Sequence, residues 1–133
     1  MSAGRLAHLC LAVLLVAGPA RAADSADGSF QSVTRFMERG GEAVFVHVCA
    51  GCHMPDAKGA VGAAHYPALA QDAKLGIASY AVFMVTNGRA GMPSFGRLLD
   101  DDQIAGVVNY VRTHFGNDYK DAVTPADVKA ARP

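Results

Sequence analysis

Apolar positions at helical spacing predict the first of three main helices over residues 35–49. Within this segment, Val44, Phe45 and Val48 fall on one helical face. The Gly40-Gly41 pair lies near its beginning, and glycine is a poor helix former, so the pair weakens the start of the helix.

A second helix is predicted over residues 78–86, with Ser79 as a candidate cap and Asn87-Gly88 as its end. The last and strongest helix is predicted over 101–115. Asp100 and Gln103 have the spacing of a capping box there, and Gly116 follows as a terminator. This helix has one apolar stripe, formed by Ile104, Val107, Val108 and Val111.

The remaining segments show no strand alternation and no internal repeat. Residues 54–77 contain five Gly or Pro residues and are predicted to be an irregular loop. Residues 89–95 form a short turn region, and 124–127 begin a short terminal helix. The predicted fold class is therefore all-α. Three modest helices make a thin core, which suggests that the domain is built around a large apolar insert.

The N-terminus has the pattern of a secretory signal peptide over residues 1–23. Arg5 precedes an apolar run from 9 to 17, and the small-residue pattern Ala20-Arg21-Ala22 follows. A buried N-terminal helix is the alternative. The run is too short to span a membrane, which needs about 20 apolar residues. We therefore expect an exported, periplasmic protein with no membrane span after cleavage. The predicted divisions of that protein are a flexible segment (24–35), one domain (36–116) and a tail with a short helix (117–133).

Charge and cysteine content narrow the function. The chain has 12 Lys+Arg and 12 Asp+Glu. Removal of Arg5 and Arg21 with the signal leaves 10 against 12, a net charge of −2. Nucleic-acid binding calls for a basic surface and is not expected. Cys10 lies in the predicted signal, so Cys49 and Cys52 are the cysteines that remain.

Cys49-Ala50-Gly51-Cys52-His53 is the chemical signature of the chain. Two thiols three residues apart at a helix end can each add to a vinyl group of haem, and the adjacent histidine then reaches the iron. Three other interpretations explain less of the motif. A thioredoxin-like redox pair calls for a βαβ setting, and structural zinc needs four ligands. A plain disulfide leaves His53 unexplained. Covalent attachment of one haem c through Cys49 and Cys52 is the favoured interpretation.

Met92 is the favoured ligand opposite His53. It lies in Gly91-Met92-Pro93, a non-helical turn that can point a thioether inward, and Met/His is a common axial pair in cytochromes c. Met84 lies in an apolar helical stretch, where core packing is the better explanation. The other Met and His candidates are less suitable by position; they are Met37, His47, Met54, His65 and His114.

Over residues 38–116 the sequence resembles the class I monohaem cytochromes c. The resemblance rests on four motifs: Gly41-x-x-x-Phe45 before the cysteines, Tyr66-Pro67-Ala68-Leu69, Gly91-Met92-Pro93-x-Phe95, and Val108-Asn109-Tyr110-Val111-Arg112. It implies a cytochrome c-like fold with three main helices and a long loop around one haem. It also implies that His53 and Met92 bind iron, that the Pro67 carbonyl accepts the Nδ1–H of His53, and that Gly41 and Phe45 meet Tyr110 where two helices cross. This family often has Gly at the position of Tyr66.

The expected function is periplasmic electron transfer, without an enzymatic activity of its own. The tail and the loop motif resemble those of small cytochromes that serve periplasmic dehydrogenases. The implied partners are redox proteins: a dehydrogenase as donor, and an oxidase or another cytochrome as acceptor. A permanently bound dehydrogenase subunit and a haem enzyme or gas sensor are the alternatives. An apolar wall of Leu69, Phe83, Phe95 and Leu98 is expected around the haem, and docking is expected at 60–63 and 89–91.

Overall fold

A computed structural model describes residues 35–133 of the chain. The predicted signal peptide and nearly all of the predicted flexible segment lie outside the described residues, so both stay predictions, as do the domain divisions. Among the described residues, no helix is long and apolar enough to cross a membrane.

The first helical run is made of three consecutive pieces. These are α1 (Gly41–Val44), the π-helical turn η1 (Phe45–Cys49) and α2 (Ala50–His53). The predicted start at residue 35 is wrong, because Gly40 has φ +82° and precedes the first helical residue. The predicted end is also too early. The run continues to His53, and Met54, with φ +65°, ends it.

The second and third predicted helices are α3 (Ala78–Asn87) and α4 (Asp101–Thr113). Gly88 ends α3 with φ +70°, as expected, but Ser79 does not cap it: Ile77 holds the cap position without a side-chain bond. The capping box of α4 is confirmed, since Asp100 accepts from the Gln103 N–H at 2.8 Å. This helix ends two residues earlier than predicted.

The terminal helix α5 (Pro125–Ala131) is confirmed, with Thr124 and Asp127 forming a second capping box. The loop 54–77 is less irregular than predicted. It holds a two-residue antiparallel ladder, β1 (Ala60–Val61) with β2 (His65–Tyr66), and a 3₁₀ turn, η2 (Ala73–Gly76). The described chain is therefore mostly helical, with one small hairpin.

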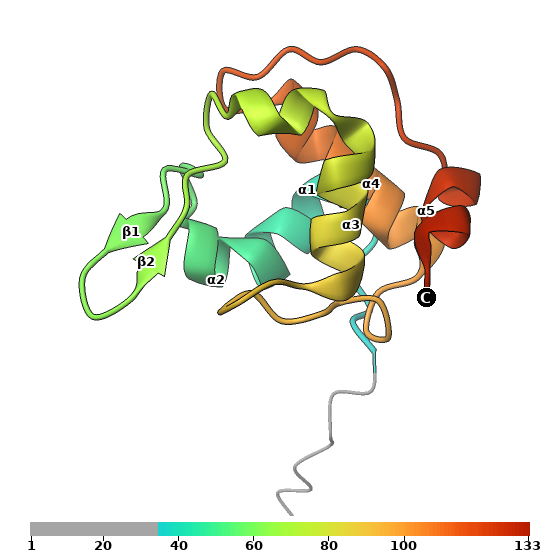
Figure 1. The fold of residues 1–133 in the computed structure, drawn as a ribbon, viewed down its shortest axis with the longest axis horizontal. Helices are drawn as coiled ribbons and strands as arrows, with labels where there is room; N and C mark the ends of the chain where they lie inside the picture. Colours follow the sequence, from blue (N-terminus) through green and yellow to red (C-terminus); the bar gives the residue numbers. More distant parts are fainter. Residues whose placement is uncertain (1–34) are drawn as a thin grey trace, which may run out of the picture. The chain divides into compact units, whose positions relative to one another are not determined.

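Helix α4 lies at the centre of the fold and packs against α1, α3 and α5 (Figure 1). The crossing of α1 and α4 is unusually close, because a Cβ on Gly41 would lie 2.1 Å from the Gly106 carbonyl oxygen and 2.8 Å from Tyr110 Cβ. The rings of Phe45 and Tyr110 lie 5.7 Å apart at the same crossing. The predicted meeting of Gly41 and Phe45 with Tyr110 is confirmed.

Candidate cofactor site

The two cysteines and His53 lie at the end of the first helical run. Cys49 closes η1, while Cys52 and His53 belong to α2. Both thiols are free, with Cys49 half-buried and Cys52 exposed. Burial, with a smaller contribution from Cys52, raises the pKa of the Cys49 thiol to about 12.

His53 is held in one ring orientation by the loop that follows it. The imidazole is 8% exposed, and Nδ1–H donates to the Pro67 carbonyl at 2.9 Å. A bond of this kind fixes the tautomer and leaves Nε2 available to a metal. Pro67 is thus placed as the sequence resemblance implies. Within residues 35–133, no three His, Cys, Asp or Glu side chains are grouped so as to bind a metal ion by themselves.

Met92 is presented by a tight turn after α3. The N–H of Arg89 donates to the Met92 carbonyl and the N–H of Met92 donates to the Arg89 carbonyl, both at 2.9 Å. Gly88 makes the approach possible, because a Cβ there would lie 2.5 Å from the Met92 carbonyl oxygen. The positive φ of Gly88 would also be strained for any other residue. The end of α3 and the turn that carries Met92 are therefore one structural unit.

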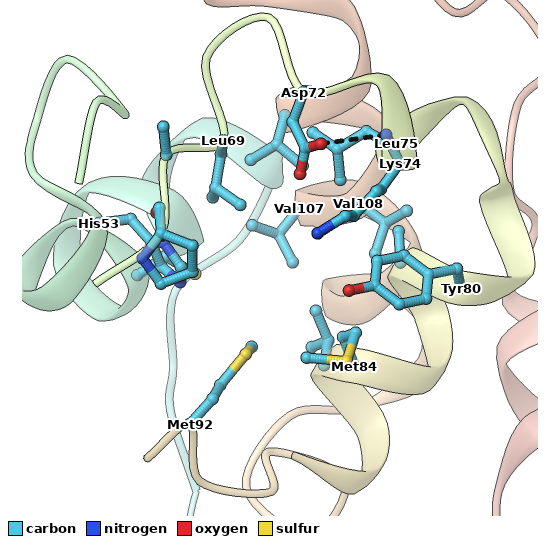
Figure 2. Close-up of a pocket in the computed structure, with 16 residues that line it drawn as sticks. His53, Leu69, Asp72, Lys74, Leu75, Tyr80, Met84, Met92, Val107 and Val108 are labelled. Atoms are coloured by element: carbon cyan, nitrogen blue, oxygen red, sulfur yellow. Dashed lines mark hydrogen bonds between the residues drawn. The ribbon is translucent and has the colours of Figure 1, made fainter. Parts of the chain in front are cut away.

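Two adjoining cavities connect these elements. One has a volume of about 170 Å³ and the other of about 530 Å³. The larger falls within the range of roughly 300–1,000 Å³ that is typical of ligand sites. The two share five lining residues, which are Cys49, His53, Pro67, Met84 and Met92. Figure 2 shows His53 and Met92 pointing into the smaller cavity from α2 and from the turn after α3.

The donors and the lining fit a c-type haem. A haem needs an apolar enclosure, two thiols at one edge, and axial ligands that approach from two sides. The thiols of Cys49 and Cys52 line the larger cavity beside His53, and Met92 comes from a separate element. The walls of the smaller cavity are chiefly aliphatic, with Leu69, Leu75, Val107 and Val108 among them.

The structure separates the other ligand candidates. Met84 lines both cavities and is thus close to the site, which sequence reasoning missed by assigning it to core packing. His65 lines the larger cavity from β2. His47 points to Glu38, with 3.5 Å between ring nitrogen and carboxylate, and His114 stacks on Tyr110. These two histidines line neither cavity, and the same holds for Met37 and Met54.

The expected apolar wall is correct in part. Leu69 lines the smaller cavity and Phe95 the larger one. The prediction for Phe83 is wrong, because the residue is 51% exposed and lines neither cavity. Leu98 also lines neither cavity. Val107 and Val108 supply wall residues that the expectation missed, although the apolar stripe of α4 was the available signal. The expected docking turn 89–91 borders the larger cavity.

Comparison with known proteins gives a family match and several relatives. Residues 37–111 match the family described as "Cytochrome C oxidase, cbb3-type, subunit III". A cytochrome c6 of Diacronema lutheri is 40% identical over 78 residues, which cover 57% of this chain and 94% of the relative. A cytochrome c6 of Rippkaea orientalis is 39% identical over 82 residues, covering 60% and 73%.

A third relative is the fructose dehydrogenase cytochrome subunit of Gluconobacter japonicus. It is 39% identical over an alignment of 92 residues, and the match covers 58% of this chain. The match spans only 19% of that subunit. The likeness to this relative therefore concerns one part of a much longer protein.

Proposed function

The chain belongs to the cytochrome c family that its residues 37–111 match, and from that membership we propose that it carries single electrons through one covalently attached c-type haem. The observation that supports this most is the convergence of Cys49, His53 and Met92 on one apolar cavity. Family membership itself implies a covalently bound c-type haem and a place in electron transport.

Four side chains would hold the group. Cys49 and Cys52 would bind it through thioether bonds, each formed when S–H adds across a vinyl C=C. His53 would ligate the iron through Nε2 on one side, and Met92 through its sulfur on the other. When bound, a c-type haem supplies an iron that takes up and releases one electron between its ferric and ferrous states.

The residues around the site favour electron transfer over ligand binding. The Pro67 carbonyl fixes the His53 ring, and the paired hydrogen bonds between Arg89 and Met92 fix the turn that presents the thioether. With both side chains bound, the iron would have no open position and would need little movement when its charge changes. Aliphatic walls exclude water, and thioether ligation raises the reduction potential further.

Carbon monoxide binding tests this function. We expect mass spectrometry to show one haem per chain. The ferrous protein should then bind carbon monoxide slowly and incompletely at neutral pH. Rapid, stoichiometric binding would replace the carrier proposal with a haem enzyme or gas sensor. Met92→Ala is the matched positive control, because removal of the sixth ligand should give rapid binding with the haem still attached.

We propose a dehydrogenase as electron donor, an oxidase or another cytochrome as acceptor, and the periplasm as location. The dehydrogenase cytochrome subunit among the relatives supports the donor, and the predicted signal peptide supports the location. Docking is proposed beside the larger cavity, where Arg89, Ala90 and Gly91 are exposed.

A free carrier and a bound subunit remain distinct versions of this proposal. The two cytochrome c6 relatives are matched over most of their length, which supports a free carrier, whereas the dehydrogenase subunit supports a permanent complex. Purification from the native source distinguishes them. A free carrier elutes alone at a mass near that of one chain, and a subunit elutes with its dehydrogenase.

A further inference from the structure

One end of the smaller cavity is polar. Besides Cys49 and His53, its polar lining side chains are Asp72, Lys74 and Tyr80. Asp72 caps η2, Lys74 lies in η2, and Tyr80 lies in the first turn of α3. Figure 2 shows the Lys74 amine and the Tyr80 hydroxyl directed into the cavity from the side opposite His53.

These two groups have no partner of their own. No carboxylate of residues 35–133 lies within ion-pair distance of the Lys74 amine, and no described residue hydrogen-bonds the Tyr80 hydroxyl. Lys74 is exposed and Tyr80 is half-buried, and both border a lining that is otherwise largely aliphatic. An ammonium and a phenol that share one end of an apolar cavity together suit a carboxylate ligand.

We propose that Lys74 and Tyr80 bind the propionate carboxylates of the haem, an inference that rests on the proposed haem site. Haem is an apolar ring with two carboxylates, and its vinyl edge is taken up by Cys49 and Cys52. The aliphatic walls match the ring, and the polar end of the cavity matches the carboxylates. Lys74 contributes the charge and Tyr80 contributes a neutral hydrogen bond.

The segment that carries Asp72 and Lys74 is held in place by hydrogen bonds to the rest of the fold. Arg112, which is fully buried on α4, donates from Nε to the Leu75 carbonyl at 2.8 Å. The Tyr119 hydroxyl donates to the Asp72 carbonyl at 3.4 Å. The 3₁₀ turn is thus fixed to α4 and to the C-terminal tail, so little ordering is left for ligand binding.

Asp72 adds a negative charge at the same end. One oxygen of its carboxylate accepts from the Lys74 backbone N–H at 3.0 Å and caps the 3₁₀ turn (Figure 2). The ferrous site carries one electron more than the ferric site. Lys74 therefore favours the ferrous state and Asp72 disfavours it. Loss of the Lys74 charge should lower the reduction potential, and loss of the Asp72 charge should raise it.

The test is a redox titration of the haem-loaded protein and three charge variants. We expect Lys74→Gln to reduce the ferrous-to-ferric ratio at a fixed potential about three-fold, or roughly 28 mV at 59 mV per tenfold change. Asp72→Asn, which keeps the cap, should raise the ratio. Lys129→Gln removes the same charge from α5, outside the cavity lining, and should leave the ratio unchanged.

A second readout separates direct contact from a general charge effect. In resonance Raman spectra, the propionate bending band should shift in Lys74→Gln and in Tyr80→Phe, but not in Lys129→Gln. If Lys74→Gln matches Lys129→Gln in both potential and spectrum while the haem stays attached and Met-ligated, the inference is overturned and the proposed function stands. Absence of covalent haem from the wild-type protein would overturn both.

Discussion

The close crossing of α1 and α4 makes Gly41 a position where a single methyl group should lower stability. In Gly41→Ala the new Cβ would lie 2.1 Å from the Gly106 carbonyl oxygen, a backbone atom that cannot rotate away. The two helices would have to separate, which would loosen the contact of Phe45 with Tyr110.

The expected cost follows from that overlap. Overpacking of a well-packed core typically costs about 1–3 kcal/mol, and contact with rigid backbone places this variant near the upper end. Gly51 is the matched control: it lies in α2 of the same helical run, is exposed, and has open space around its Cβ position. Gly51→Ala keeps the cysteine spacing and should gain about 0.5–1 kcal/mol from helix propensity.

Urea unfolding of the haem-loaded proteins, followed by circular dichroism, measures both changes. We expect the free energies of unfolding of the two variants to differ by about 3–4 kcal/mol, with wild type between them. Equal midpoints for Gly41→Ala and wild type would refute the close-crossing argument. A loss of stability in Gly51→Ala would contradict the open space around the Gly51 Cβ position.

Three further changes test other parts of the account. Gly88→Ala would place a Cβ 2.5 Å from the Met92 carbonyl oxygen. We therefore expect weaker far-red absorption of the ferric protein and a lower unfolding midpoint. An unchanged spectrum would contradict the link between the end of α3 and the turn that carries Met92. The Gln103 N–H, followed by Arg39, lowers the pKa of Asp100 despite some opposing desolvation, so the folded state favours the carboxylate. Its stabilisation is complete above about pH 4 and is lost as the pH falls through the folded-state pKa; Asp100→Asn should therefore flatten the acid limb of the stability profile, and an unaltered limb would contradict this. Arg112→Leu leaves the Leu75 carbonyl unpaired in the interior, so urea unfolding should show a free energy of unfolding lower by about 3 kcal/mol. A decrease below about 1 kcal/mol would contradict the anchoring role of Arg112.

Helix ends were predictable where a side chain or a glycine determines them locally. Asp100 and Thr124 each cap a helix through bonds within four residues, so sequence reveals them. The start of the first run depends on the φ of Gly40, which the sequence does not specify between two adjacent glycines. The β1–β2 ladder pairs only two residues on each side, too few for an alternation pattern.

The site was predictable where chemistry is carried by contiguous residues. Cys49 to His53 and Gly91 to Pro93 are local motifs. The orientation of α3 is different, because residues 82–85 are all apolar and give no stripe. Sequence alone could not decide that Met84 faces the cavity and Phe83 faces outward. Lys74 and Tyr80 were missed for a related reason: the path of η2 and the orientation of α3 bring them to the cavity.

The proximity of Met84 to Met92 makes the identity of the sixth ligand the most direct test of the account. The measurement is the far-red charge-transfer band of Met-ligated ferric haem, recorded for wild type, Met92→Leu and Met84→Leu at neutral pH. The account predicts that the band is present in wild type, is lost in Met92→Leu and persists in Met84→Leu, with haem covalently attached in all three. Persistence of the band in Met92→Leu, or its loss in Met84→Leu alone, would contradict it.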